Sequence, residues 1–206
     1  PQIIDLGSNV RVIHLKAGPY HRAKKGLHQY IPEFLISLRR FQRSEQVRYD
    51  LIHSHYWLSG CAGVKLGKEL NIPHVTTFHT LAKKKIQARV GEIESQLRIR
   101  VESQVVRDAD AIVVSTDHER EDLCRLYQTN PQKVWVVPAG VDLELFRPVD
   151  KMIARQNLGL TEKKIVLSVG RIEPLKGLDI LIGAMAGLAD PTDTRLIIVG
   201  GQFGRD

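Results

Sequence analysis

Cysteine, aromatic residues and long apolar runs are all scarce in this sequence of 206 residues. The two cysteines, Cys61 and Cys124, stand apart and lack the spacing of metal ligands, so a reducing, cytoplasmic location is the expectation. No apolar run approaches the roughly 18 residues of a membrane-spanning helix, and we expect no transmembrane segment. Aromatic residues make up only 6% of the chain and are not interleaved with the cations. This pattern argues against a surface that stacks nucleic-acid bases.

The overall composition is that of an ordinary globular protein, with a surplus of positive charge. Hydrophobic residues make up 43% and charged residues 26% of the sequence, as in a typical globular domain. The formal net charge of +7 favours an anionic partner, and phosphorylated metabolites, nucleic acid and acidic lipid all fit it. The length allows one large domain or two small ones.

Short β-branched runs alternate with helical patterns along the whole chain. Residues 75–78, 111–114 and 165–169 have the composition of buried strands, and apolar residues at every fourth position predict a helix over 92–107. Further strands are expected at 11–15, 49–53, 133–137 and 195–199, and further helices at 27–38, before 70, at 116–127, at 153–158 and from 178. This alternation predicts an α/β fold with parallel sheets built from right-handed βαβ units.

Three local patterns carry predictions of their own. Ser59 and Gly60 are expected in the turn into the helix that ends near Leu70, and Lys83-Lys84-Lys85 in a basic run that leads into a polar loop. Thr116-Asp-His-Glu119 has the form of a capping box, with acidic residues in the first helical turn. The segment 143–149 looks like a hinge. We therefore expect an N-terminal domain at residues 1–145 and the first part of a second domain at residues 146–206. A binding cleft is expected between the two domains.

A strand, a loop and a helix follow one another between Ile165 and Leu188. The strand ends at Gly170, and the loop places Arg171 and Lys176 where the carboxyl end of the strand opens. Ligands of open parallel sheets bind at that end, and a planar guanidinium beside an ammonium suits a diphosphate. On spacing alone two interpretations stay open, a phosphate clamp of a sugar-nucleotide site or a pair of solvated loop cations.

Two patterns imitate metal sites. His53 and His55 alternate along a strand and so share a face, but no third ligand follows at a sensible spacing. Asp108-Ala-Asp110 has an Asp-X-Asp form at a helix-to-strand junction, where helix capping or solvation explains it better. We therefore expect no metal ligands.

Five stretches, taken in order, together resemble one enzyme family. They are His53-Ser-His-Tyr-Trp-Leu-Ser-Gly60, Thr77-Phe-His-Thr80, Ala109-Asp-Ala-Ile-Val-Val-Ser115, Pro138-Ala-Gly-Val-Asp142 with Phe146-Arg-Pro148, and Val169-Gly-Arg-Ile-Glu-Pro-Leu-Lys-Gly177. They are similar to the family 4 retaining glycosyltransferases of GT-B fold, and most similar to the branch of the sucrose-phosphate and sucrose synthases and the inositol-phosphate glycosyltransferase of the mycothiol pathway.

The resemblance implies two Rossmann-like domains with parallel sheets, both incomplete in this chain. The first strand and glycine-rich loop of the family's N-terminal domain have no counterpart here, and neither has its C-terminal Glu-x7-Glu motif. We therefore expect an internal piece of a longer enzyme, inactive or nearly so by itself.

On the donor side, the resemblance assigns Gly170, Arg171 and Lys176 to the clamp of the diphosphate. Arg171 and Lys176 would neutralise the leaving group as charge develops on it. His79 matches a histidine that lies against the donor sugar. The catalytic residues implied are thus His79, Arg171 and Lys176. The alternative for His79 is a satisfied core histidine at a strand end.

On the acceptor side, the resemblance matches Tyr56 and Thr80 to residues that contact the acceptor phosphate, with Lys24 and Arg98 as their basic partners. The alternative for Lys24 and Arg98 is ordinary surface charge, and Lys25 competes with Lys24 for the same match.

The activity implied is transfer of a sugar from a nucleotide sugar such as UDP-glucose to a hydroxyl of a phosphorylated sugar or polyol, with retention of configuration. Neither a metal nor a cofactor is implied, and no nucleic-acid partner. A non-catalytic protein of the same fold that binds nucleotide sugars or nucleic acid is the alternative, and a GT-B epimerase is a third, which the motifs favour less.

Overall fold

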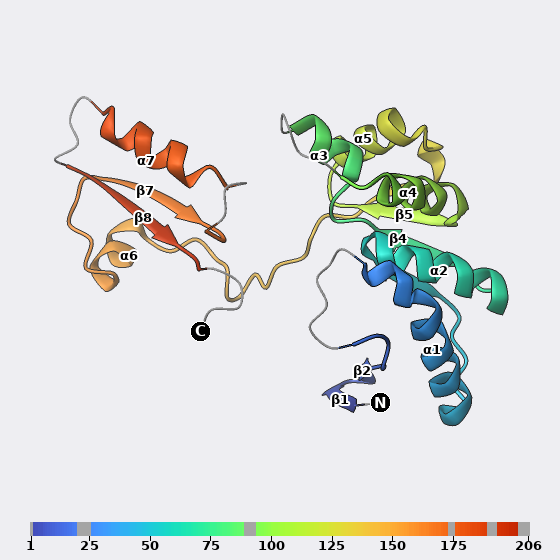
Figure 1. The fold of residues 1–206 in the computed structure, drawn as a ribbon. Helices are drawn as coiled ribbons and strands as arrows, with labels where there is room; N and C mark the ends of the chain where they lie inside the picture. The colour runs from blue at the N-terminus through green and yellow to red at the C-terminus, as the bar shows by residue number, and fades with distance from the viewer. Residues whose placement is uncertain (1, 20–25, 89–93, 173–175, 189–192, 202–206) are drawn as a thin grey trace. The chain divides into compact units, whose positions relative to one another are not determined.

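The computed structural model describes residues 2–19, 26–88, 94–172, 176–188 and 193–201. The chain forms two compact units, Pro1–Gly140 and Val141–Asp206, which Figure 1 shows with their helices and strands labelled. Both units contain parallel strands joined through helices, so the predicted α/β class is confirmed.

The first unit is built on a four-stranded parallel sheet. Its strands follow one another in the order β3 (Ile52–His55), β4 (His74–Thr77), β5 (Ala111–Val114) and β6 (Val134–Val136). Because neighbours in space are also neighbours in sequence, each pair of strands forms a βαβ unit. All four carboxyl ends therefore meet at one edge of the sheet.

Helices on the faces of this sheet enclose the core. They are η1 (Leu27–Tyr30), α1 (Ile31–Glu45), α2 (Tyr56–Leu70), α3 (Ala82–Ala88), α4 (Gln96–Asp108), α5 (Asp117–Tyr127) and η2 (Pro131–Lys133). The main core joins residues of the strands, of the helices and of the segment between β4 and α3: Val64, Phe78, Leu81, Val105, Val106, Ile112, Val114, Leu123 and Val134. A second cluster packs α1 on α2 through Ile31, Leu35, Ala62 and Leu66.

The predicted capping box at the start of α5 is confirmed. The Thr116 hydroxyl accepts a hydrogen bond from the Glu119 amide at 3.2 Å, and the Glu119 carboxylate accepts one from the Ser115 amide at 2.7 Å. The first bond satisfies an amide of the first helical turn, and the second ties Glu119 to the residue before the N-cap, in place of the usual bond to the N-cap amide.

The prediction that Ser59 and Gly60 lie in a turn is wrong, because α2 begins directly after β3 and includes both. Gly60 is needed inside the helix for close packing: a β-carbon on it would come within 2.9 Å of Val105 Cγ1 on α4. A glycine selected by helix packing carries the same sequence signal as a glycine selected by a turn.

The basic run Lys83-Lys84-Lys85 lies in the short helix α3, and residues 89–93, which follow this helix and where the polar loop is expected, lie outside the described residues. Each ammonium has a partner: the Leu126 carbonyl for Lys83, the Asp122 carboxylate for Lys84, and the Glu94 carboxylate for Lys85. These partners offset the repulsion that three adjacent lysines would otherwise create in one short helix.

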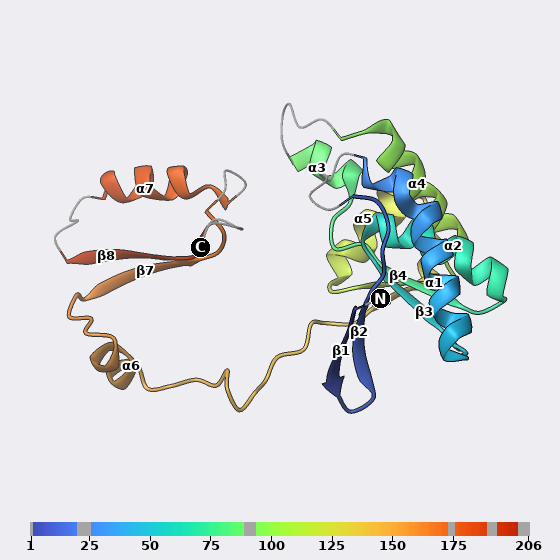
Figure 2. The ribbon, with the colours of Figure 1, turned by 60° about the horizontal axis from the view of Figure 1, so that its bottom comes forward.

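An antiparallel hairpin at the N-terminus lies outside the βαβ pattern. Strand β1 (Gln2–Gly7), which the sequence patterns did not predict, pairs with β2 (Val10–His14), the strand expected at residues 11–15. Ser8 and Asn9 both have positive φ, as a two-residue hairpin turn requires. The hairpin is the blue element at the N-terminus in Figure 2.

The second unit is a smaller α/β arrangement. It contains α6 (Lys151–Asn157), β7 (Lys164–Val169), α7 (Leu178–Ala186) and β8 (Thr194–Val199). Strands β7 and β8 run parallel from the Lys164–Thr194 pair to the Val169–Val199 pair, and α7 lies along them in Figures 1 and 2.

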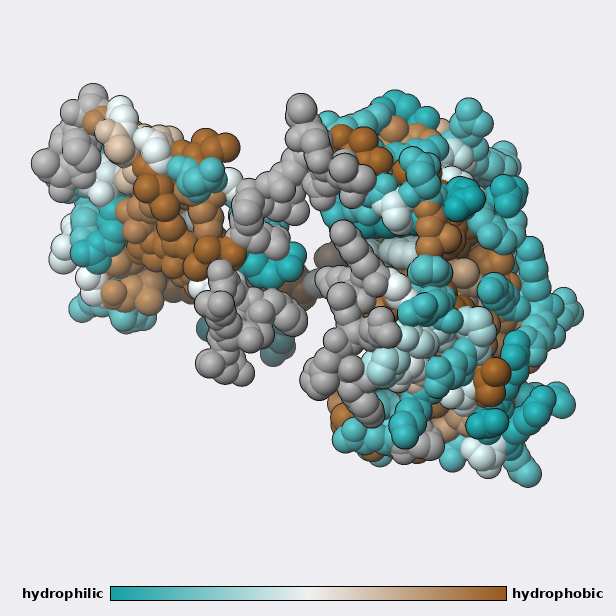
Figure 3. All heavy atoms as spheres, in the orientation of Figure 1, coloured by the Kyte–Doolittle hydropathy of each residue, from teal (hydrophilic) through white to brown (hydrophobic). Residues whose placement is uncertain are grey.

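Many apolar side chains of this unit remain exposed. Leu167, Val169, Ile180 and Val199 are examples, and the brown surface over this unit in Figure 3 shows how they gather. No helix in the described ranges is long and apolar enough to cross a membrane.

Candidate functional site

Strands β3 and β4 both lead into residues with a left-handed backbone at the carboxyl edge of the sheet. Tyr56, directly after β3, has φ of 77°, and His79, two residues after β4, has φ of 59°. Such angles are uncommon for residues other than glycine. They concentrate at active sites and ligand-binding positions, and this edge is where open parallel sheets bind ligands. The backbone thus marks the same edge as the sequence motifs.

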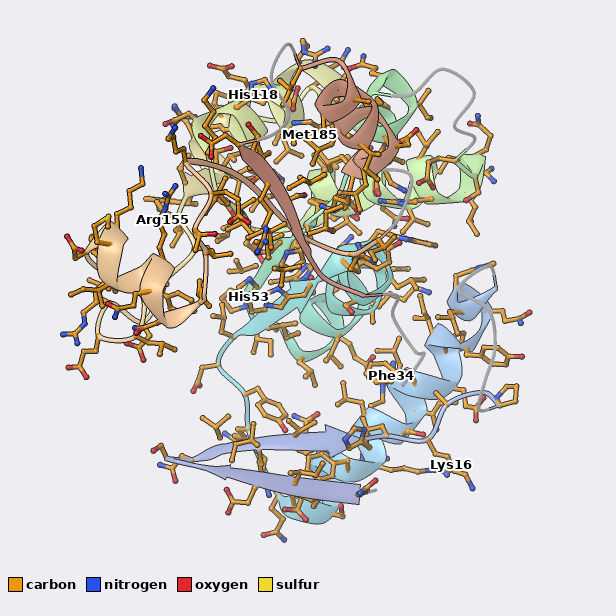
Figure 4. The ribbon with its side chains drawn as sticks, turned by 90° about the vertical axis from the view of Figure 1, so that its left-hand side faces the viewer. Lys16, Phe34, His53, His118, Arg155 and Met185 are labelled. Carbon is orange, nitrogen blue, oxygen red and sulfur yellow. The ribbon has the colours of Figure 1, made fainter. Side chains whose placement is uncertain are left out.

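Three histidines cluster at this edge. The His55 Nδ1 and His79 Nε2 atoms lie 2.8 Å apart, at hydrogen-bond distance, and the two ring planes are inclined by 21° with centroids 5.1 Å apart. The His53 ring, labelled in Figure 4, lies 4.3 Å from that of His55. His53 Nε2 is 3.0 Å from the Thr77 hydroxyl. Because His79 is exposed, the alternative of a core histidine is wrong.

Arg98 contacts both Tyr56 and Thr80, two of the residues predicted to bind the acceptor. Its Nη2 donates to the carbonyl and to the hydroxyl oxygen of Thr80, each at 3.0 Å, and its Cζ lies 5.3 Å from the centre of the Tyr56 ring. The Arg98 side chain is only 6% exposed, so its interpretation as ordinary surface charge is wrong. Tyr56, Thr80 and Arg98 form one cluster, which we call the acceptor cluster.

Two carboxylates hold the guanidinium of Arg98 in place. Nε donates to Glu102 at 2.6 Å and Nη1 to Glu94 at 2.9 Å. Burial alone would lower the pKa of Arg98, but the hydrogen bond and charge of Glu102, with smaller contributions from Tyr56 and Glu94, raise it. Arg98 therefore remains charged inside the unit.

Glu102 is fully buried and links three elements. Besides Arg98, its carboxylate accepts hydrogen bonds from the Ala82 amide at the start of α3, at 2.9 Å, and from the Tyr127 hydroxyl at the end of α5. Burial first, and then the bond to Glu102, raise the pKa of Tyr127. Sequence reasoning missed Glu102, although its i,i+4 spacing from Arg98 on a predicted helix was a signal for the ion pair.

A pocket of about 400 Å³ opens next to the acceptor cluster within the first unit. It lies at the carboxyl ends of β4 and β5, and its lining includes Thr77, Phe78, His79, Thr80, Val113, Val114, Ser115 and Leu123. Lys84 and Asp122 also line it and form an ion pair with each other. The pocket therefore combines apolar walls with hydroxyl groups, as binding sites for small organic molecules commonly do.

In the second unit, Gly170 and Lys176 are neighbours in space. Lys176 Cδ and Cε lie 3.9 Å from where a β-carbon on Gly170 would sit. The Gly170 amide continues the strand pairing by donating to the Val199 carbonyl at 2.9 Å. Arg171 follows Gly170 and is exposed.

Gly200 supports this loop from the adjacent strand. A β-carbon on Gly200, which has φ of 154°, would overlap the Gly170 carbonyl oxygen. Sequence reasoning noted Gly200-Gly201 only as a strand end, and missed that glycine is required there. Lys24, the remaining predicted acceptor residue, lies outside the described residues.

The two patterns that imitate metal sites are engaged within the protein. His55 is hydrogen-bonded to His79, Asp108 accepts from Lys68 at 2.8 Å, and Asp110 accepts from the His74 amide at 2.7 Å. Across the described part of the chain, no group of three or more histidine, cysteine or acidic residues is arranged to hold a metal ion.

The sequence matches the models of two known protein families. Residues 4–145 match the model of Glycosyltransferase Family 4. The chain belongs to glycosyltransferase family 4. Residues 150–206 match the model described as Glycosyl transferases group 1.

Relatives of this family 4 chain include D-inositol 3-phosphate glycosyltransferases. Those of Actinosynnema mirum and Saccharomonospora viridis are each 42% identical to it, over 99% of the chain. The chain spans about half the length of these relatives, 51% and 50% respectively.

Solved structures show the same GT-B architecture. Sucrose-phosphate synthase from Thermosynechococcus elongatus matches with a TM-score of 0.84 and 31% identity, over 100% of this chain and 51% of its own. Anabaena HepE in complex with UDP-glucose matches with a TM-score of 0.65 and 21% identity, over 84% of this chain and 44% of its own. The predicted GT-B fold and its nearest branch are therefore confirmed.

The histidines predict how the stability of the first unit depends on pH. Desolvation first, and then repulsion from His55 and His79, lower the pKa of His53, and burial lowers that of His74. Between the ordinary histidine pKa of about 6.5 and the lower folded values, the unfolded chain binds more protons, so stability falls as pH falls.

We therefore expect the melting temperature to decrease from about pH 7 to about pH 5, where the carboxylates stay ionised. A His53→Gln variant should show a shallower decrease over the same range. A melting temperature that rises on acidification would contradict this reasoning.

Proposed function

We propose that the protein of which this chain is part transfers a sugar from a nucleotide-sugar donor to a hydroxyl group of a phosphorylated acceptor, with retention of anomeric configuration. The observation that carries the proposal is the acceptor cluster: Tyr56, Thr80 and Arg98 lie together at the carboxyl edge of the sheet, next to His79. The relatives named D-inositol 3-phosphate glycosyltransferase support a phosphorylated acceptor.

Within this proposal, Arg98 acts mainly by holding its neighbours. Four of its five N–H donors are engaged by Glu94, Glu102 and Thr80. The hydroxyl groups of Thr80 and Tyr56 then bind the acceptor phosphate, and Lys24 adds charge. The remaining N–H of Arg98 and its positive charge strengthen these bonds, since hydrogen bonds between ionised groups are the stronger ones.

The donor diphosphate is assigned to the second unit. Gly170 lets the backbone approach the phosphates, while Arg171 and Lys176 neutralise the charge that develops as the diphosphate leaves. His79 contacts the donor sugar. Residues 1–145 then form the acceptor-side domain, and residues 146–206 the beginning of the nucleotide-sugar domain.

The incoming hydroxyl attacks the anomeric carbon from the same face of the sugar that the diphosphate leaves. This geometry retains the anomeric configuration without a protein nucleophile. The leaving diphosphate accepts the proton of the incoming hydroxyl while the bond to the anomeric carbon passes from one oxygen to the other. Side chains supply the charge compensation, so the proposal includes neither a metal nor a cofactor.

Both cysteines, Cys61 and Cys124, are free thiols, which supports the predicted reducing, cytoplasmic location.

The test is a transfer assay on the full-length protein. UDP-, GDP- and ADP-sugars are combined with inositol phosphates and sugar phosphates, and release of the nucleoside diphosphate is followed. NMR of the product then gives its anomeric configuration. We expect acceptor-dependent release and a retained configuration. Saturable binding of nucleotide sugars without transfer would favour the non-catalytic alternative, and an inverted product would contradict the proposed mechanism.

A further inference from the structure

We infer that His55 is a positioning residue: it holds the imidazole of His79 in the orientation in which that ring meets the donor sugar. The inference rests on the proposed function, because it concerns the reaction proposed for the same site. Neither the family motifs nor the acceptor cluster assigns a role to His55.

The hydrogen bond between the two rings is the first observation. His55 Nδ1 and His79 Nε2 are 2.8 Å apart, and the ring planes are inclined by only 21°. In the described part of the chain, His55 is the only hydrogen-bond partner of the His79 ring. His79 is exposed and has a left-handed backbone, so neither a packed core nor a regular strand holds its side chain.

The position of His55 on helix α2 is the second observation. His55 is the N-cap residue of α2, with an extended backbone, yet its side chain makes no hydrogen bond to the first helical turn. Serine, threonine, aspartate and asparagine are preferred at an N-cap because their side chains do bond there. This position therefore gives up helix capping, and its side chain contacts His79 instead.

His55 is itself held in place. The His53 ring lies 4.3 Å from it, and His53 Nε2 bonds to the Thr77 hydroxyl. In the strand register, His53 is paired with Val75 and His55 with Thr77. A rigid strand pair therefore supports the chain of contacts Thr77–His53–His55–His79.

The consequence is a fixed ring with one nitrogen left for a ligand. An imidazole has two ring nitrogens, and Nε2 of His79 is occupied by His55, so Nδ1 remains to bind the sugar. Without His55 the ring can turn about its side-chain bonds. Misplacement of a contacting group by about 1 Å can lower a rate about a hundredfold.

A His55→Ser variant separates positioning from folding, because serine can cap α2 but is too short to reach His79. In the full-length protein we expect kcat for transfer to fall by about ten- to a hundredfold. The KM for the acceptor should stay within about twofold, because the acceptor cluster is intact. The melting temperature should be unchanged or higher by about 1–4 °C, from the new cap. His14→Asn, a change in an exposed histidine of β2, is the matched control and should keep the wild-type rate.

A double-mutant cycle tests whether His55 acts through His79. His79→Asn suits the left-handed backbone, which asparagine tolerates. If the inference holds, the double variant His55→Ser, His79→Asn is no slower than His79→Asn alone.

Each other outcome overturns the inference. Wild-type kcat in His55→Ser would do so, as would rate losses that multiply in the double variant, or a lower kcat accompanied by an equal loss of folded protein. If the wild-type protein transfers no sugar, the proposed function fails together with the inference. If the wild type is active and the cycle is multiplicative, only the inference fails.

Discussion

A Lys176→Ala variant of the full-length protein is expected to transfer sugar about 100 to 1,000 times more slowly than the wild type, as removal of a group that stabilises transition-state charge typically does. Lys176 is exposed at the loop after β7, with its aliphatic chain next to Gly170, so alanine should not disturb the fold. The loss should appear in kcat, because charge on the leaving diphosphate grows as the bond to the sugar breaks.

Two further variants make this result specific. Lys176→Arg keeps the charge and should retain part of the activity, although the two cations differ in shape. Lys164→Ala removes an exposed lysine from the opposite end of β7 and should retain the wild-type rate. Wild-type kcat in Lys176→Ala, or an equal loss in Lys164→Ala, would end the assignment of Lys176 to the diphosphate.

The second large effect concerns stability. A Glu102→Leu variant is expected to lose about 3–5 kcal/mol of unfolding free energy, because it leaves the buried Arg98 guanidinium without its main partner. The same change removes the acceptor of the Ala82 amide and of the Tyr127 hydroxyl. For a chain of this size the corresponding drop in melting temperature is roughly 10 °C.

An exposed ion pair provides the control for that measurement. Glu45 pairs with Arg11 at 3.1 Å, and both side chains are more than a third exposed, so Glu45→Leu should cost less than about 1 kcal/mol. Chemical denaturation with a common m-value is the appropriate measurement. Equal stabilities of Glu102→Leu and the wild type would show that the network around Arg98 does not hold the unit together.

Hydrophobic periodicity and local capping chemistry predicted most of the fold. The alternation of β-branched runs with helical patterns gave both parallel sheets, and Thr116 with Glu119 marked the start of α5 because a capping box is made within four residues. The error at Gly60 has a physical cause. A residue distant in sequence, Val105, decides that this glycine lies inside a helix, and a local pattern does not contain that residue.

For the site as well, the residue types could be predicted from the sequence, whereas contacts between distant residues could not. The resemblance to the family named Tyr56, Thr80 and Arg98, and the fold brings the first two into contact with Arg98. The bond between His55 and His79 joins residues 24 positions apart and depends on the register of β3 and β4. Two left-handed residues, Tyr56 and His79, aim the side chains at this edge, and such a backbone is too uncommon outside glycine to be predicted from residue type at either position.

The most direct measurement compares a phosphorylated acceptor with its unphosphorylated form in the wild-type protein. Inositol 3-phosphate and inositol form one such pair, assayed with the same nucleotide sugar. If the acceptor cluster binds a phosphate group, as we propose, the kcat/KM ratio should be about 100 or more in favour of the phosphorylated form. A ratio near one, in a protein that transfers sugar to both, would contradict the account.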